Sequence, residues 1–263
     1  MRGRGGSGGQ GELYAVKLGG SILTDKRRPF SLRLGVVERL ADELSGAADR
    51  VVGLVLGGGS YGHYVAHEAL SLSAQPREAI SMITMSMLEL AMAVSDVLQS
   101  RGLWPVLYPP HSFCKPSGVR PGCSWELAAP LLDAGALPVT YGDAVPCSGG
   151  GACIVSGDEL LLEMACSLGA GTAVYVTDVD GLMHGGRVLG EVTLDELETL
   201  AAASGGRREG YDVTGGLARK LLVLRENRCP GLRSVWIING LRPGRLERLL
   251  ATGSAPGTRI LLG

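Results

Sequence analysis

A lysine followed by paired glycines is the first feature of this sequence that could do chemistry. Lys17, Gly19, Gly20 and Ser21 lie within the segment YAVKLGGSILTDK, residues 14–26. Glycines leave backbone N–H groups open to an anion, and a lysine beside them adds a compact positive charge. The pattern therefore predicts a loop that handles phosphate groups.

Later segments repeat this combination of glycine, aspartate and lysine. They read GGGSYGH at 57–63, SGDE at 156–159, TDVDG at 177–181 and DVTGGLARK at 212–220. The apolar runs up to TDVDG end in glycine, aspartate or both. Because ligands of open α/β sheets bind beyond the carboxyl ends of the strands, we expect these segments to converge.

Phosphoryl transfer is the chemistry that these residue types favour. Lys17 and Lys220 each lie next to a double glycine, and two lysines with a magnesium ion could stabilise the charge of a moving phosphoryl group. Asp158 could hold both lysines in place or help to ligate magnesium. An ordinary helix N-cap is the alternative role for this aspartate.

Alternating apolar runs predict the elements that must position these residues. Strands are expected at 15–18, 51–56, 104–108, 137–140, 152–155, 172–176, 235–238 and 258–262. Helical periodicity predicts helices at 31–45, 60–71, 76–101, 124–133, 159–168, 194–203 and 217–227, with a short one after Pro243. Strands that alternate with helices indicate an α/β fold with a parallel sheet.

Composition and motifs exclude several classes of protein. The 263 residues carry 25 basic and 26 acidic side chains, so nucleic-acid binding has no general electrostatic basis. The absence of G-x-x-x-x-G-K-[ST] excludes a P-loop, and the first strand lacks a dinucleotide-binding G-x-G-x-x-G. Residues 1–12 are expected to be a disordered leader, and no apolar run is expected to span a membrane.

The six cysteines form no C-x-x-C pair and have no histidine at ligand spacing. They occupy positions 114, 123, 147, 153, 166 and 229. We expect reduced thiols, no zinc site and a cytoplasmic protein, with a Cys114–Cys123 loop disulfide as a minor alternative. His67, His111 and His184 match no motif and are expected at the surface or in packing.

Taken together, these segments resemble the amino acid kinase family from Tyr14 to Ile260. KLGGS, GGGS, TDVDG and TGG followed by Lys220 occur in the family's order and approximate spacing. The resemblance implies an ATP- and magnesium-dependent kinase with a three-layer αβα sandwich around a mainly parallel eight-stranded sheet. It also implies a phosphoryl-acceptor lobe at 13–170 and an ATP-binding lobe at 171–263.

Two details resemble the isopentenyl phosphate kinases within that family. They are Thr24-Asp25-Lys26 after KLGGS and His63 at the end of GGGSYGH. This resemblance implies that isopentenyl phosphate, a phosphate monoester, is converted to isopentenyl diphosphate by direct in-line transfer. His63, Gly58, Gly59 and Gly157 would then bind the acceptor.

The same resemblance assigns the remaining site residues. The catalytic set would be Lys17, His63, Asp158 and Lys220. The nucleotide would be bound by Lys17, Gly19, Gly20, Ser21, Lys26, Gly59, Asp178, Asp180, Gly216 and Lys220. No metal ligand of the protein's own is expected.

Three alternatives remain open from the sequence. A fosfomycin kinase would offer a similar oxyanion to His63, and a non-catalytic nucleotide- or anion-binding protein could share the fold. Kinases of acetylglutamate, glutamate or uridylate are disfavoured, since no arginine lies at 51–76.

The methionine-rich helix 76–101 is apolar on more than one face, so it is expected to be covered on both. We interpret it mainly as core and homodimer interface. Met82, Ile83 or Ser86 could also contact a prenyl tail.

Overall fold

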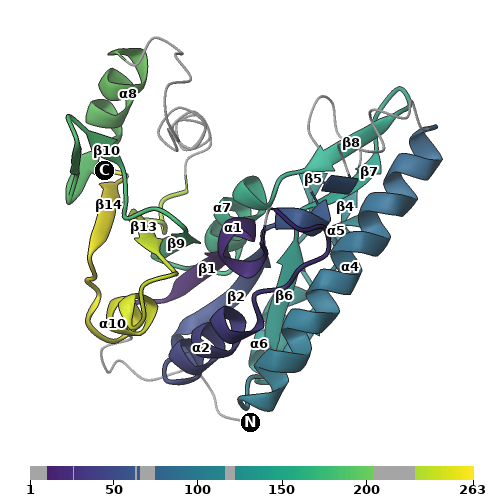
Figure 1. The fold of residues 1–263 in the computed structure, drawn as a ribbon, viewed down its shortest axis with the longest axis horizontal. Coiled ribbons are helices and arrows are strands. Elements are labelled where there is room, and N and C mark those ends of the chain that lie inside the picture. The colour runs from purple at the N-terminus through teal and green to yellow at the C-terminus, as the bar shows by residue number, and fades with distance from the viewer. Residues whose placement is uncertain (1–10, 26, 63, 66–74, 116–121, 204–228) are drawn as a thin grey trace.

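An eight-stranded sheet forms the centre of the computed structural model, which describes residues 11–25, 27–62, 64–65, 75–115, 122–203 and 229–263 (Figure 1). The strand order is β12-β14-β13-β9-β1-β2-β6-β3, and β13 and β14 pair antiparallel while the other neighbours are parallel. The strands are β1 (Tyr14–Leu18), β2 (Val51–Leu56), β3 (Pro105–Leu107), β6 (Leu137–Tyr141), β9 (Thr172–Thr177), β12 (Glu191–Thr193), β13 (Ser234–Asn239) and β14 (Gly257–Leu261). The predicted mainly parallel sheet is confirmed.

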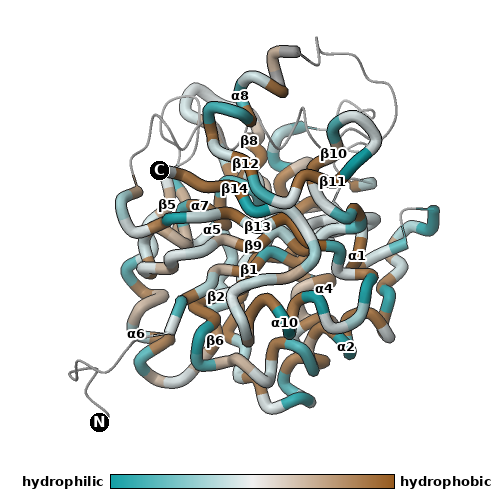
Figure 2. The backbone as a smooth tube through the Cα atoms, turned by 90° about the vertical axis from the view of Figure 1, so that its left-hand side faces the viewer, coloured by the Kyte–Doolittle hydropathy of each residue, from teal (hydrophilic) through white to brown (hydrophobic). Residues whose placement is uncertain are grey.

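Helices cover both faces of this sheet, as Figures 1 and 2 show. The helices are α1 (Gly20–Leu23), α2 (Leu34–Ser45), α4 (Pro76–Ser100), α5 (Pro110–Phe113), α6 (Ala128–Asp133), α7 (Gly157–Ser167), α8 (Leu194–Ala203) and α10 (Arg245–Thr252), with a 3-10 turn η1 at Ala48–Arg50. Two buried clusters result. Helices α2, α4 and α10 contribute to one of them, and α7 and α8 contribute to the other.

The central strands are continuous apolar runs because the sheet is buried on both faces. Every residue of β2, β6 and β13 is buried. In β1, Val16 and Leu18 belong to the first cluster, whereas Ala15 belongs to the second. The three-layer sandwich expected from the sequence is therefore present.

Three small hairpins stand outside the main sheet. They are β4–β5 (Cys114–Lys115 with Gly122–Cys123), β7–β8 (Asp143–Pro146 with Ala152–Val155) and β10–β11 (Met183–His184 with Arg187–Val188). The β7–β8 hairpin has the glycine turn that the sequence predicts, with positive φ at Gly149, Gly150 and Gly151.

Several elements differ from the sequence predictions. The short helix α1 and the edge strand β12 were not expected. Helix α6 begins at Ala128, later than predicted, because the Ser124 N–H donates to the Phe113 carbonyl and the Ser124 carbonyl accepts from Tyr108. Helix 217–227 and residues 63 and 66–71 of helix 60–71 lie outside the described residues.

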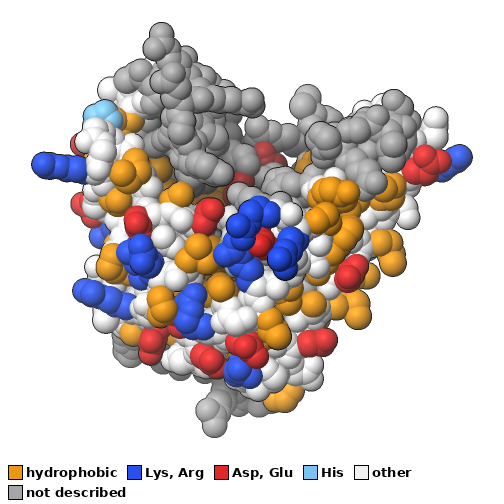
Figure 3. All heavy atoms as spheres, in the orientation of Figure 1, with side chains coloured by type: hydrophobic (Ala, Val, Ile, Leu, Met, Phe, Trp, Pro, Cys, Tyr) orange, Lys and Arg blue, Asp and Glu red, His pale blue; other side chains and the backbone are white. Residues whose placement is uncertain are grey.

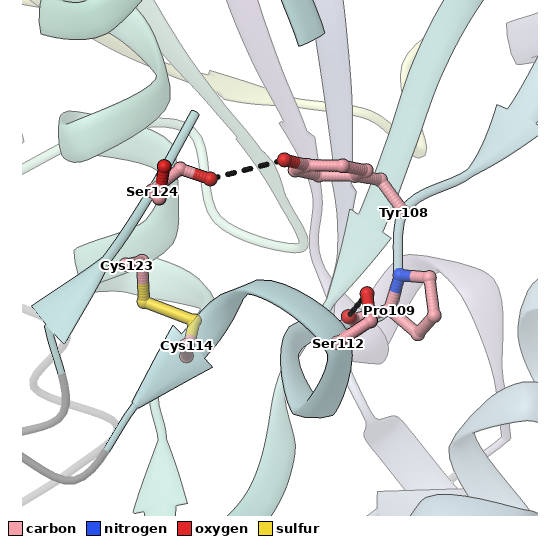
Figure 4. Close-up of a disulfide and its surroundings, with 6 residues drawn as sticks. All are labelled: Tyr108, Pro109, Ser112, Cys114, Cys123 and Ser124. Carbon is pink, nitrogen blue, oxygen red and sulfur yellow. Dashed lines mark hydrogen bonds between the residues drawn. A yellow bond between two sulfur atoms is a disulfide. The ribbon is translucent and has the colours of Figure 1, made fainter. Parts of the chain in front are cut away.

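The expectation of reduced thiols is wrong, because all six cysteines are paired. Cys114–Cys123 and Cys147–Cys153 each close a hairpin, and Cys166–Cys229 links the end of α7 to a residue far along the chain. Figure 4 shows Cys114–Cys123 between β4 and β5, near the hydrogen bond from Tyr108 to Ser124. The minor alternative for Cys114 and Cys123 is the one that the structure adopts.

Helix α4 differs from its prediction in two respects. Among the described helices it alone is long and apolar enough to cross a membrane by length and composition, with 33% of its apolar window buried. One side packs on the sheet through residues such as Ile83 and Met87. On the other side Met85 is 64% exposed and Met92 is 55% exposed, so the described chain leaves this side uncovered.

Candidate active site

Lys17 and Asp158 form an ion pair where β1 meets α7. The Lys17 ammonium contacts an Asp158 carboxylate oxygen, and the two side chains are only 13% and 19% exposed. The N-cap of α7 is Ser156, whose hydroxyl accepts from the Asp158 N–H at 3.3 Å. The alternative role of Asp158 as the N-cap is therefore wrong, and its carboxylate instead forms an ion pair with Lys17.

Tyr175 supports this pair, although the sequence reading did not identify it. Its ring centroid lies 5.7 Å from the Lys17 ammonium, and its hydroxyl donates to the Asp158 carbonyl at 3.1 Å. Burial raises the pKa of Tyr175 well above 10.0, and the charges of Asp158 and Glu159 add to that effect, so the hydroxyl stays protonated. Tyr175 lies directly beside Lys17 in the parallel register of β1 and β9. Its position on a predicted strand was the sequence feature that could have pointed to it.

The first two glycine loops pack backbone against backbone. A Cβ on Gly20 would lie 2.1 Å from the Gly59 nitrogen, and a Cβ on Gly57 would lie 2.4 Å from the Gly20 nitrogen. Gly59 has φ +48°, and a Cβ there would lie 2.0 Å from the Thr24 hydroxyl oxygen. The paired glycines are thus required by this close approach.

Thr24 connects the same two loops by hydrogen bonds. Its hydroxyl donates to the Gly20 carbonyl at 2.8 Å and accepts from the Ser60 N–H at 2.8 Å. The threonine stands at the start of the Thr24-Asp25-Lys26 signature, so the structure gives its first residue a definite role in holding the loops together.

The Ser21 hydroxyl joins the first loop to TDVDG by donating to an Asp178 carboxylate oxygen at 2.7 Å. Asp180 instead accepts from the guanidinium of Arg245 at 2.7 Å and from the side-chain amide of Asn239 at 3.2 Å. The sequence reading did not single out Arg245 or Asn239.

Basic side chains gather over α1 and the segment after it (Figure 3). Arg27 and Arg28 are exposed, and Arg33 donates to the Thr24 carbonyl. Side-chain and backbone hydrogen bonds from Arg27 lower the pKa of Asp25 to about 2. The overall charge of −1 therefore conceals a local positive region close to the glycine loops.

A cavity of about 420 Å³ lies where these loops meet. Its polar lining includes Lys17, Gly19, Gly20, Ser21, Gly58, Gly59, Gly157 and Asp158. Its apolar lining comes from Ile83 and Met87 on α4 and from Ile154 and Val155 on β8. The cavity thus combines anion-binding groups with an apolar wall.

The structure brings together most of the described site residues predicted from the sequence. Asp178 adjoins the cavity through Ser21, whereas Asp180 is not among its lining residues. Lys26, His63, Gly216 and Lys220 lie outside the described residues. Asp143 also lines the cavity, and the sequence analysis assigned it no role.

Residues 12–229 match the amino acid kinase family. The isopentenyl phosphate kinase of Methanocaldococcus jannaschii is 30% identical over 94% of this chain and 98% of its own length. The isopentenyl phosphate kinase of Haloferax volcanii is 37% identical over the same shares of the two chains, 94% and 98%. A crystal structure of isopentenyl phosphate kinase has a TM-score of 0.76 at 27% identity, over 94% of this chain and 100% of that chain. The chain therefore belongs to the amino acid kinase family.

Proposed function

We propose that the protein is an isopentenyl phosphate kinase, which transfers a phosphoryl group from ATP to isopentenyl phosphate and yields isopentenyl diphosphate and ADP. The observation that carries this proposal is the cavity that joins Lys17 and two glycine loops to the apolar wall. Relatives named as isopentenyl phosphate kinases, matched along nearly their whole length, support it.

In this proposal each half of the cavity binds one substrate. Gly19, Gly20 and Ser21 lie on the ATP side, while Gly58 and Gly157 border the acceptor phosphate. Ile83 and Met87 offer an apolar surface to a short prenyl tail, which an acceptor with a carboxylate or a nucleoside would not match. This apolar wall also favours a prenyl phosphate over fosfomycin.

The chemical step needs positioning and positive charge more than proton transfer. The acceptor is an ionised phosphate monoester, so its oxygen can attack without a general base. Lys17, held by Asp158 and Tyr175, would stabilise the charge that spreads over the transferring group. We propose the same kind of role for Lys220, phosphate contacts for Lys26 and His63, and a nucleotide contact for Gly216.

Magnesium fits this site as an ion carried by the nucleotide. Among the described residues no three histidine, cysteine, aspartate or glutamate side chains gather as a metal site. Protein sites for Mg²⁺ often supply one or two carboxylates while phosphates and water complete the shell. Asp158 in the cavity lining and Asp178 beside Ser21 are the carboxylates that we propose for this contact, and the bound ion would neutralise charge on the ATP phosphates.

We propose a homodimer formed through the outer side of α4. This side presents the exposed Met85 and Met92, which are seven residues apart and thus on one face. Helix α4 itself lies at the edge of the molecule in Figure 1. Trp104, 61% exposed, lies beside the edge strand β3. We keep the two lobes proposed from the sequence, 13–170 for the acceptor and 171–263 for ATP, although of the described residues that line the cavity Thr177 alone belongs to the second range.

We keep the cytoplasm as the proposed location because the reaction draws on intracellular ATP. The three disulfides remove the earlier reason for this location. An intracellular protein with three disulfides is unusual, so the pairing inside cells needs a direct test. Alkylating intact cells before lysis and counting blocked thiols by mass spectrometry tests this: six blocked thiols would contradict the pairing inside cells.

ADP release with magnesium and ATP tests the function. Separate reactions would contain isopentenyl phosphate, fosfomycin, acetylglutamate or uridine monophosphate. We expect turnover with isopentenyl phosphate alone and its loss in His63→Ala. Activity only with fosfomycin would reassign the acceptor, and silence with all four would favour a binding protein.

A further inference from the structure

Asp143 is a buried carboxylate in the wall of the cavity, and the proposed reaction does not use it. The residue is 1% exposed and begins β7. Its carboxylate accepts from the Thr84 hydroxyl at 2.9 Å and from the Ala144 N–H at 2.8 Å, and it lies 2.8 Å from His111 Nδ1. His111, expected at the surface or in packing, thus has a specific partner.

These contacts join three elements that surround the acceptor side of the cavity. Thr84 lies on α4 and follows Ile83, which lines the cavity. His111 lies on α5. Across the β7–β8 hairpin, Asp143 pairs with Val155 and Ala144 pairs with Ile154, so the carboxylate sits at the base of the remaining apolar wall.

Disulfides brace the chain within or next to two of the three elements. Cys114–Cys123 closes the chain directly after α5, as Figure 4 shows. Cys147–Cys153 closes the β7–β8 hairpin beyond Asp143. One disulfide therefore braces the segment that follows α5 and the other braces the β7–β8 hairpin, and the Asp143 carboxylate links α5 and the hairpin to each other and to α4.

A carboxylate at this position has an electrostatic cost. Buried charge is unfavourable unless it is paired and hydrogen-bonded, and a negative group near an acceptor phosphate repels it. The donors from Thr84 and Ala144, with His111, satisfy the Asp143 oxygens. Apolar residues could pack the same volume at no such cost, so the retained charge points to a requirement for directional contacts.

We propose that Asp143, held by Thr84 and His111, positions the apolar wall and thereby sets the length of the acceptor tail that the cavity admits. This inference rests on the proposed prenyl phosphate kinase activity. The carboxylate fixes the base of β7–β8 against α4, so the gap between Ile83 and Ile154 is set by hydrogen bonds of fixed length. These three residues act through the wall and are positioning residues.

The test compares Asp143→Asn, Thr84→Val and His111→Gln with the parent enzyme, using isopentenyl phosphate and the ten-carbon geranyl phosphate. The matched control is Asp133→Asn, which removes an exposed carboxylate from α6. We expect each of the three variants at Asp143, Thr84 and His111 to raise the KM for isopentenyl phosphate about tenfold, which is the effect of one lost hydrogen bond. We also expect kcat and the KM for ATP to be unchanged.

The decisive readout is the ratio of kcat/KM for geranyl phosphate over isopentenyl phosphate. We expect this ratio to rise in Thr84→Val, His111→Gln and Asp143→Asn and to stay constant in Asp133→Asn. If Thr84→Val and His111→Gln are folded and active but leave this ratio unchanged, the proposal that Asp143 positions the apolar wall is overturned. Equal losses on both acceptors, accompanied by a raised KM for ATP, would also overturn it. A parent enzyme inactive on both prenyl phosphates would instead overturn the proposed function and the tail assignment with it.

Discussion

Replacing Asp158 by asparagine tests the proposed role of the Lys17 pair most directly. The change keeps the size of the side chain and removes its charge. The two side chains are 13% and 19% exposed, so their contact is largely shielded from water. A hydrogen bond to a charged group contributes about 1.5–3 kcal/mol. If that energy aims Lys17 at the transition state, kcat falls about 10- to 150-fold, since each 1.4 kcal/mol is about tenfold.

The KM for ATP separates this role from simple binding. Asp158→Asn removes a negative charge near the phosphates, so we expect the KM for ATP to stay constant or fall. Steady-state ADP release at saturating isopentenyl phosphate gives both parameters. Glu163→Gln, which removes a carboxylate elsewhere on α7, is the matched control and should keep full activity. An unchanged kcat in folded Asp158→Asn would refute the positioning of Lys17 by this carboxylate.

Further predictions concern stability and assembly. Gly59→Ala should lower the free energy of unfolding by more than about 2 kcal/mol, because its Cβ would lie 2.0 Å from the Thr24 oxygen. Gly185→Ala, with a similar φ of +56° and open space around it, should cost about 1 kcal/mol in urea unfolding, and equal losses would contradict the steric argument. Burial raises the pKa of Glu163, so its ionisation opposes folding and wild-type stability falls as pH rises from the unfolded value of 4.5 through the folded one. Glu163→Gln should therefore raise Tm at pH 7 and lose that advantage near pH 4, whereas a pH-independent difference would argue against burial as the cause. Light scattering should give a dimer mass for the parent and a monomer mass for Met85→Glu with Met92→Glu, and a monomeric parent would remove the dimer proposal.

Much of the fold could be predicted because buried strands and helices show recognisable patterns of apolar residues in the sequence. The runs that became β2 and β13 are apolar throughout, which is what a sheet covered on both faces requires. The strand β12 has no such apolar run, since only Val192 of its three residues is buried. Helix α1 was missed because a four-residue helix is too short to show periodicity.

The candidate site was predictable where a loop carries its own chemistry. Lys17 and Gly20 stand in a motif, so their convergence with Gly59 could be anticipated. Tyr175 and Asp143 lie on strands, and their roles arise from partners far away in sequence.

The cysteines show the same limit. Cys166 and Cys229 are 63 residues apart, and only the fold brings them together. The lack of C-x-x-C pairs argued for reduced thiols, and no spacing rule joins residues as distant as these two.

The central place of β1 has a consequence for how such a fold can diversify. This strand pairs in parallel with β9 on one side and with β2 on the other, and the pairing with β2 has a register shift between Tyr14 and Ala15. Neighbouring strands lie about 4.8 Å apart, so three successive strand ends span roughly 10 Å by backbone geometry alone. The spacing of the strands therefore sets the separation of the proposed donor and acceptor sites, and no hinge is needed to set it. Substitutions around β6, β7 and α4 could therefore exchange one acceptor for another while the distance travelled by the phosphoryl group is inherited unchanged.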